Sequence, residues 1–120
     1  MTTRRMKTYT GQTGYVYQYY FVGQREAFPE ERSAPAMEFI FDVTADRKTT
    51  FAVSVFLKHS AVESWKAIHG RPLTTAEQYA AAKLRLFQAF DEIEKMQQDA
   101  RRLVIEDAEI EPLLAQLGVA

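Results

Sequence analysis

The sequence has 120 residues, of which 47% are hydrophobic and 26% are charged, values close to those of ordinary globular domains. We expect one domain over residues 1–120, and the sequence leaves open whether residues 1–13 are ordered. The 15 basic and 16 acidic side chains give a formal net charge of −1, which disfavours nucleic acid and acidic membrane surfaces as partners. Without an apolar run of membrane-spanning length, a secretory signal or a cysteine, the sequence favours a cytoplasmic protein.

Three segments in the first half show the alternation of apolar and polar residues that is typical of β-strands. Their ranges are 15–22, 37–44 and 50–57. The connector 45–49 is short enough for a hairpin between the second and third strands. The connector 23–36 is longer and contains Pro29 and Pro35, so we expect an exposed loop there.

The alternation also predicts which side chains face the core. Odd-numbered residues of these strands, Tyr17 and Tyr19 among them, should face the helices, and Tyr20 should point the opposite way. The other face would then carry more apolar side chains than a solvated face should have. These are Val16, Tyr20, Val22, Ile40, Ala52 and Phe56.

After residue 57 the sequence pattern changes to that of helices. Ser60 and Glu63 have the spacing of a capping box, which predicts a helix start at Ser60. Gly70 and Pro72 should end this helix. Trp65, in its middle, should anchor the helix to the sheet.

A second capping box, Thr74 with Glu77, predicts another helix, whose composition favours its continuation to about Val104. A last short helix should contain Pro112 in its first turn, Gly118 after it, and an apolar face of Leu113, Leu114 and Leu117. The expected fold class is therefore α+β, with a three-stranded antiparallel sheet followed by two main helices and a short C-terminal helix.

The candidate ligand-binding residues come from the tyrosine-rich first strand and from both ends of the first helix. They are Tyr15, Tyr17, Tyr20, His59, His69 and Arg71. Aromatic side chains on a sheet can stack on rings of a ligand, although strand propensity and core packing explain the tyrosines as well. We assign no catalytic residue, metal ligand or cofactor, because two histidines without a ligand spacing cannot complete a metal site.

The second helical segment carries apolar residues at alternating spacings of four and three, which is a heptad pattern. Its members are Ala82, Leu86, Ala89, Ile93, Met96, Ala100 and Leu103. A straight helix over 75–104 would be about 45 Å long, whereas a domain of this size is roughly 35 Å across. The end of the helix would project, and two copies could pair through it.

These patterns favour a small non-catalytic cytoplasmic protein that acts by association, as a homodimer or as an accessory subunit with a protein partner. The predicted interface combines the open sheet face with the end of the long helix. Its residues are Tyr20, Ile40, Phe56, Ile93, Met96, Ala100 and Leu103. The alternative is a ligand-binding or enzymatic module that uses the tyrosine-rich strand with His59, His69 and Arg71 at one cleft.

Overall fold

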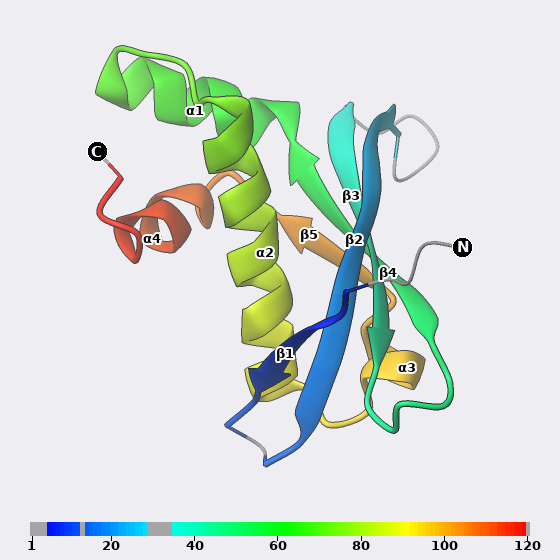
Figure 1. The fold of residues 1–120 in the computed structure, drawn as a ribbon. Coiled ribbons are helices and arrows are strands. Elements are labelled where there is room, and N and C mark those ends of the chain that lie inside the picture. Colours follow the sequence, from blue (N-terminus) through cyan, green and yellow to red (C-terminus); the bar gives the residue numbers. More distant parts are fainter. Residues whose placement is uncertain (1–4, 13, 29–34, 120) are drawn as a thin grey trace.

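A curled five-stranded mixed sheet with helices against one face makes up the fold (Figure 1), and the computed structural model describes residues 5–12, 14–28 and 35–119. The described elements, in chain order, are β1 (Lys7–Thr10), β2 (Val16–Ala27), β3 (Ala36–Thr44), β4 (Phe51–Lys58), α1 (His59–His69), α2 (Thr75–Glu92), α3 (Met96–Asp99), β5 (Arg102–Ile105) and α4 (Ile110–Ala115). The strands lie in the order β1-β2-β3-β4-β5. Neighbours from β1 to β4 are antiparallel, and β5 lies parallel to β4.

The prediction of a three-stranded antiparallel sheet is wrong, because a strand is added at each edge. β1 pairs with β2 within the segment whose order the sequence left open. β5 pairs with β4 within the segment that was expected to be helical. Both edge strands are four residues long, too short to show a period of two that stands out from the surrounding sequence.

The three central strands were predicted in nearly the right places. The hairpin over residues 45–49 is present, β3 begins one residue earlier than predicted, and β4 is shifted by one residue toward the C-terminus at both ends. β2 is longer than expected, because it continues to Ala27 through an irregularity in the register between Phe21 and Gly23. Pro29 in the predicted loop lies outside the described residues, and Pro35 immediately precedes β3.

The prediction of one long straight helix over 75–104 is also wrong, because α2 ends at Glu92 and Ile93 has an extended backbone. Tyr9 donates a hydrogen bond from its hydroxyl to Asp91 at 2.8 Å, and the backbone amide of Gln12 donates to the same carboxylate at 3.0 Å. The end of α2 is therefore tied to the segment that includes β1. The chain beyond it turns back across the sheet to form α3 and β5 (Figure 1).

The helix caps follow the sequence in part. The capping box of Thr74 and Glu77 is confirmed at the start of α2, and Gly70 ends α1 with a left-handed backbone. The capping box at Ser60 is absent, because α1 begins one residue earlier, at His59. The Ser60 hydroxyl instead donates to Asp107 at 2.5 Å, a bond to a residue 47 positions away that no local pattern indicates.

The C-terminal helix was predicted in the right place. Pro112 lies in the first turn of α4, and Leu113 and Leu114 are buried. Leu117 follows the helix and is 48% exposed, so it is not part of the apolar face.

The core lies between the sheet and α2. As predicted, Tyr17 and Tyr19 are buried in it and Trp65 is fully buried at the centre of α1. Aromatic rings form much of the contact, with Tyr17 stacked on Phe90 at 4.3 Å between centroids. None of the helices in the described residues is long and apolar enough to cross a membrane.

The residues beyond α2 that carry the heptad pattern are buried inside this core. Met96, Ala100 and Leu103 are each at most 4% exposed, and Ile93 packs against the same cluster. Met96 lies on α3, Leu103 lies on β5, and Ile93 and Ala100 lie in the connectors after α2 and α3. They do not share one helix face, so they form no projecting surface on which a second copy could pair.

The position of β5 makes a testable prediction about stability. Leu103→Ala should reduce the free energy of unfolding by about 2–5 kcal/mol, because it leaves a cavity in the core. Leu117→Ala, the matched control at an exposed position, should change it by less than about 0.5 kcal/mol. Urea unfolding followed by circular dichroism measures both, and a Leu103→Ala variant as stable as the parent would contradict the burial of β5.

Candidate functional site

The six predicted ligand-binding residues do not converge on one cleft. Tyr15 and Tyr17 line a cavity at one end of β2, and Tyr20 lies on the other face of that strand. His59 is at the start of α1. His69 is the last residue of α1, Arg71 follows the helix, and both contact the Trp65 ring. Each location therefore has to be considered by itself.

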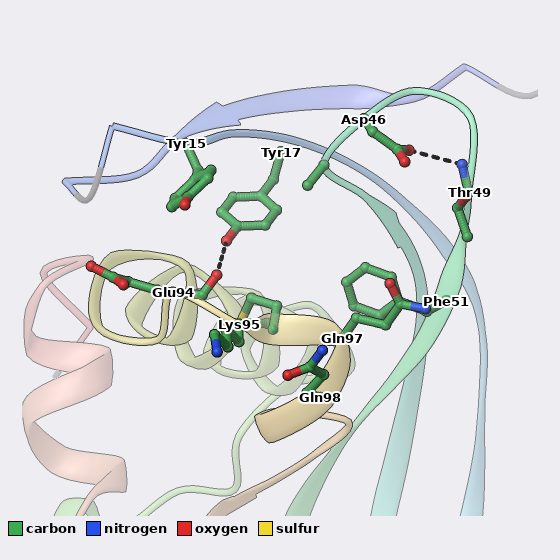
Figure 2. Close-up of a pocket in the computed structure, with 11 residues that line it drawn as sticks. Tyr15, Tyr17, Asp46, Thr49, Phe51, Glu94, Lys95, Gln97 and Gln98 are labelled. Atoms are coloured by element: carbon green, nitrogen blue, oxygen red, sulfur yellow. Dashed lines mark hydrogen bonds between the residues drawn. The ribbon is translucent and has the colours of Figure 1, made fainter.

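The cavity at Tyr15 and Tyr17 has a volume of about 230 Å³ and lies between the sheet and the segment that connects α2 to β5. Figure 2 shows Tyr17 pointing toward this segment, with Phe51 on the other side of the cavity and Lys95, Gln97 and Gln98 along its floor. Alternation brings Tyr17 and Phe51 to the helix side of the sheet. Because α2 ends at Glu92, residues 94–98 can line the opposite side, and the turn between β3 and β4 contributes Ala45, Asp46 and Thr49. We call this cavity the Tyr17 pocket.

The polar groups of the Tyr17 pocket are partly engaged. The Tyr17 hydroxyl donates to the Glu94 carbonyl oxygen at 3.5 Å, the outer limit of a hydrogen bond. Burial raises the pKa of Tyr17, so this hydroxyl stays protonated at neutral pH. At the β3–β4 turn, Asp46 Oδ1 accepts from the backbone amides of Lys48 and Thr49 at 2.8 Å each. The amide of Thr49 in particular lowers the pKa of Asp46, which keeps the carboxylate ionised.

His59 lines a second cavity, of about 250 Å³, together with Val62, Glu63 and Gln78. Its Nε2 is 3.6 Å from a carboxylate oxygen of Glu26. An ion pair at such an exposed position contributes little to stability. The described residues contain no group of three or more side chains that could hold a metal ion.

His69 and Arg71 support the packing of Trp65. The His69 ring stacks on the indole at 4.1 Å, and its Nε2 is 2.5 Å from Glu111 on α4. The Arg71 guanidinium lies 4.8 Å from the centre of the indole ring and forms a two-pronged ion pair with Glu77, each contact 2.9 Å long. Both side chains thus connect α1 to its neighbouring helices, which accounts for them without a ligand.

The face of the sheet that points away from the described helices carries a second candidate site, which we call the open face. Its centre is Glu38 on β3, a carboxylate that is only 6% exposed. Arg25 donates from Nε to one of its oxygens at 2.7 Å, and the Ser54 hydroxyl donates to the other at 2.6 Å. Burial raises the pKa of Glu38, but the hydrogen bonds from Ser54 and Arg25 outweigh burial, and the pKa lies below its ordinary value. The carboxylate is therefore ionised at neutral pH.

A basin of about 510 Å³ lies above Glu38. Phe28, Phe56, Arg25 and Arg102 contribute to its walls, and the Arg102 guanidinium lies 5.0 Å from the centre of the Phe56 ring. The predicted interface residue Phe56 is thus covered, being 4% exposed, while Tyr20 and Ile40 are half-buried on the same face.

The sequence analysis did not identify Glu38, Arg25, Ser54 or Asp46 as functional candidates. A charged residue flanked by Met37 and Phe39 within a strand is a weak signal for a buried carboxylate. Arg25 was missed because it was placed in a loop, and the irregularity of the register near Gly23 brings it opposite Glu38. The role of Asp46 follows from the turn, which no spacing in the sequence specifies.

Comparisons with known proteins add no assignment, since no family model, no curated protein and no solved structure matches the chain. The functional argument therefore rests on the geometry of this molecule.

The ion pair of Arg71 makes a testable prediction. Its guanidinium is the main reason that the pKa of Glu77 is lowered to about 2, with a further contribution from the backbone amide of Thr74. Arg71→Ala should therefore raise the pKa of Glu77 toward, but not fully to, the ordinary value of 4.5. An NMR titration of the side-chain carboxyl carbons measures this.

Arg101→Ala serves as the matched control, because Arg101 donates to the Ala52 carbonyl oxygen and has no contact with Glu77. It should leave the pKa of Glu77 unchanged. A Glu77 titration unaffected by Arg71→Ala would contradict the structural role of Arg71 and return it to the ligand candidates.

Proposed function

We propose that this protein is a non-catalytic cytoplasmic protein that acts by association through the open face, and that its first partner is a second copy of the same chain. The observation that carries the proposal is an uncovered sheet face with exposed apolar side chains. Val16 and Val22 on β2 are 44% and 48% exposed, and Phe28 just beyond the strand is 70% exposed. Such a patch loses unfavourable contact with water when a partner covers it.

The charges of the open face support a second copy as the partner. A two-fold contact brings the same patch of each subunit together, so the patch must contain groups complementary to its own. Arg25, Arg102 and Asp42 lie on this face with Glu38, which is nearly buried and already paired with Arg25, so the face carries both signs of charge and little net charge. A face with charges of both signs can pair with an identical face, and it attracts a polyanion such as nucleic acid only weakly.

The size of the open face also supports the proposal. The five strands have 37 residues together, and strand spacings of about 4.8 Å with a rise of about 3.3 Å per residue give a face of roughly 600 Å² in projection. A stable interface takes about 800 Å² of accessible surface from each partner. Because side chains roughen the face, its accessible surface is close to this requirement.

The alternative of a ligand-binding or enzymatic module with one combined cleft has less support. That module needs His59, His69 and Arg71 beside the tyrosines, and they lie in separate places. Two of them, His69 and Arg71, are already engaged with carboxylates and with Trp65.

The proposal predicts the mass of the protein in solution. Light scattering coupled to size exclusion at micromolar concentration should give twice the 13.8 kDa mass of the chain. Val22→Lys should give the mass of one chain, because two lysines would face each other or be buried without partners at the contact. Since Val22 is exposed in the single chain, the substitution should not unfold it.

Ile68→Lys is the matched control. Ile68 is an exposed apolar side chain on α1, 66% accessible and remote from the open face, so this variant should remain a dimer. The mass of one chain for the unmodified protein excludes the second copy as partner. A dimer that Ile68→Lys disrupts and Val22→Lys leaves intact excludes the open face.

A further inference from the structure

Positive charge gathers where β1 meets α2, and no acidic residue is near it in the sequence. Residues 1–25 contain no aspartate or glutamate, and neither do residues 78–90, which make up most of α2. Arg5, just before β1, Lys7, its first residue, and Lys83 on α2 belong to these two segments. Among the described residues, none of the three forms an ion pair with a carboxylate.

The fold brings Lys7 and Lys83 together. Strand β1 lies against the C-terminal half of α2 (Figure 1), where the Tyr9 ring stacks on the Phe87 ring. Because alternate residues of a strand point to the same side, Lys7 shares the side of Tyr9 and faces the helix. Lys83 lies one turn before Phe87, and its Nζ is 5.9 Å from the centre of the Phe87 ring. The two lysine side chains therefore meet between the strand and the helix.

A cleft of about 170 Å³ lies at this meeting point, and we call it the Lys7 cleft. The residues that line it are Arg5, Lys7, Tyr19, Tyr20, Phe21 and Tyr79. Lys83 borders the cleft, since its Nζ is 5.9 Å from the centre of the Tyr79 ring. A water molecule takes about 30 Å³ of the liquid, so the cleft has room for a phosphate group with its five non-hydrogen atoms.

The positive charges of the Lys7 cleft repel one another. Burial lowers the pKa of Lys83, and the neighbouring Lys7 side chain lowers it further. The rings of Tyr79 and Phe87 compensate little, because 5.9 Å is close to the limit of about 6 Å for cation–π attraction. An anion between the two ammonium groups would replace one repulsion by two attractions. The aromatic surroundings make these attractions stronger than they would be in open water.

The number of positive charges indicates which anion fits. A phosphate group carries nearly two negative charges at neutral pH and has several strong acceptor oxygens, whereas a carboxylate carries one charge on two oxygens. From the convergence of Arg5, Lys7 and Lys83 on one cleft we propose that the Lys7 cleft binds a phosphate group, either as inorganic phosphate or as part of a small phosphomonoester. The cleft is formed within one chain, so binding does not require association through the open face.

The first test is a titration of the full chain with sodium phosphate at neutral pH and constant ionic strength, followed by the backbone amide signals in ¹H–¹⁵N NMR spectra. Saturable shifts should appear for residues of the cleft, including Lys7, Tyr19 and Lys83. Sodium acetate should cause no saturable shifts. Glycerol 3-phosphate distinguishes the two sources of the phosphate group, because its binding identifies a phosphomonoester, whereas binding of inorganic phosphate alone identifies the free ion.

Matched variants test the assigned lysines. Lys7→Gln and Lys83→Gln each remove one charge and keep a side chain of similar length, and each should weaken phosphate binding about tenfold, the size of one lost hydrogen bond to a charged group. Lys66→Gln is the control, because it removes the same charge from an exposed position on α1. It should leave binding unchanged. The amide spectrum of each variant also shows that it is folded.

The titration of Lys83 gives a second measurement. Bound phosphate should raise the pKa of Lys83, because a negative charge beside the amine favours its protonated form. The charged side chains that share the cleft among the described residues, Lys7 and Arg5, are both basic and act in the opposite direction. The ¹³Cε signal of Lys83, followed against pH with and without phosphate, measures the change, and the signal of Lys66 should show none.

Several results would overturn the proposal. They are the absence of saturable shifts with both phosphate compounds, equal binding of acetate, unchanged binding by both cleft variants, a loss with Lys66→Gln as large as that with Lys83→Gln, and a Lys83 pKa that phosphate does not raise. A protein that is monomeric in solution would contradict the proposed association and leave this test unaffected.

Discussion

The stacking of aromatic rings between the first two strands and α2 determines how the rest of the chain is arranged. Tyr17 lies on Phe90 and Tyr9 lies on Phe87, in each case 4.3 Å apart and within 10° of parallel. Because Phe87 and Phe90 are on the same side of one helical turn, the two pairs hold the end of α2 under β1 and β2. A helix held there cannot continue in a straight line without leaving the sheet and exposing its apolar side chains.

The return of the chain to the other edge of the sheet follows from this constraint. After Glu92 the chain passes through α3 to β5, where Leu103 and Ile105 enter the core and the Ser54 amide donates to the Arg101 carbonyl oxygen. The backbone groups of β5 find their partners on β4, which would otherwise be an edge strand. The same return places residues 94–98 opposite Tyr17 and Phe51, so the end of the helix creates the Tyr17 pocket.

The sheet therefore separates two surfaces with different physical properties. On the helix side, rings and aliphatic side chains are packed closely, and the Tyr17 pocket is a small gap between rigid walls. On the open face the polar side chains neutralise one another, with Glu38 bound by Arg25 and Ser54. A buried ionised carboxylate costs free energy unless it is paired, so this network fixes the positions of the groups that a partner would meet.

Local patterns in the sequence were sufficient to predict the central strands, the sides of the sheet toward which Tyr17, Tyr19 and Tyr20 point, and the cap at Thr74. Each depends on residues within one or two turns or on the alternation of a single strand. Tyr15 and Tyr17, predicted as ligand-binding candidates, line a cavity, but their binding of a ligand stays a prediction. The other lining residues of that cavity were not predicted, because they come from segments 28 or more positions away from Tyr17.

The tertiary structure decided the edge strands, the end of α2 and the composition of both candidate sites. β5 consists of residues that a helix would accommodate, and only the unpaired backbone of β4 makes an extended conformation more favourable. No glycine or proline marks the end of α2. Asp91 is bound instead by the Tyr9 hydroxyl and the Gln12 amide, about 80 residues earlier in the chain. Local propensity differences of about 1 kcal/mol or less per residue are smaller than the gain from burying Met96, Leu103 and Ile105, and so packing determined the outcome.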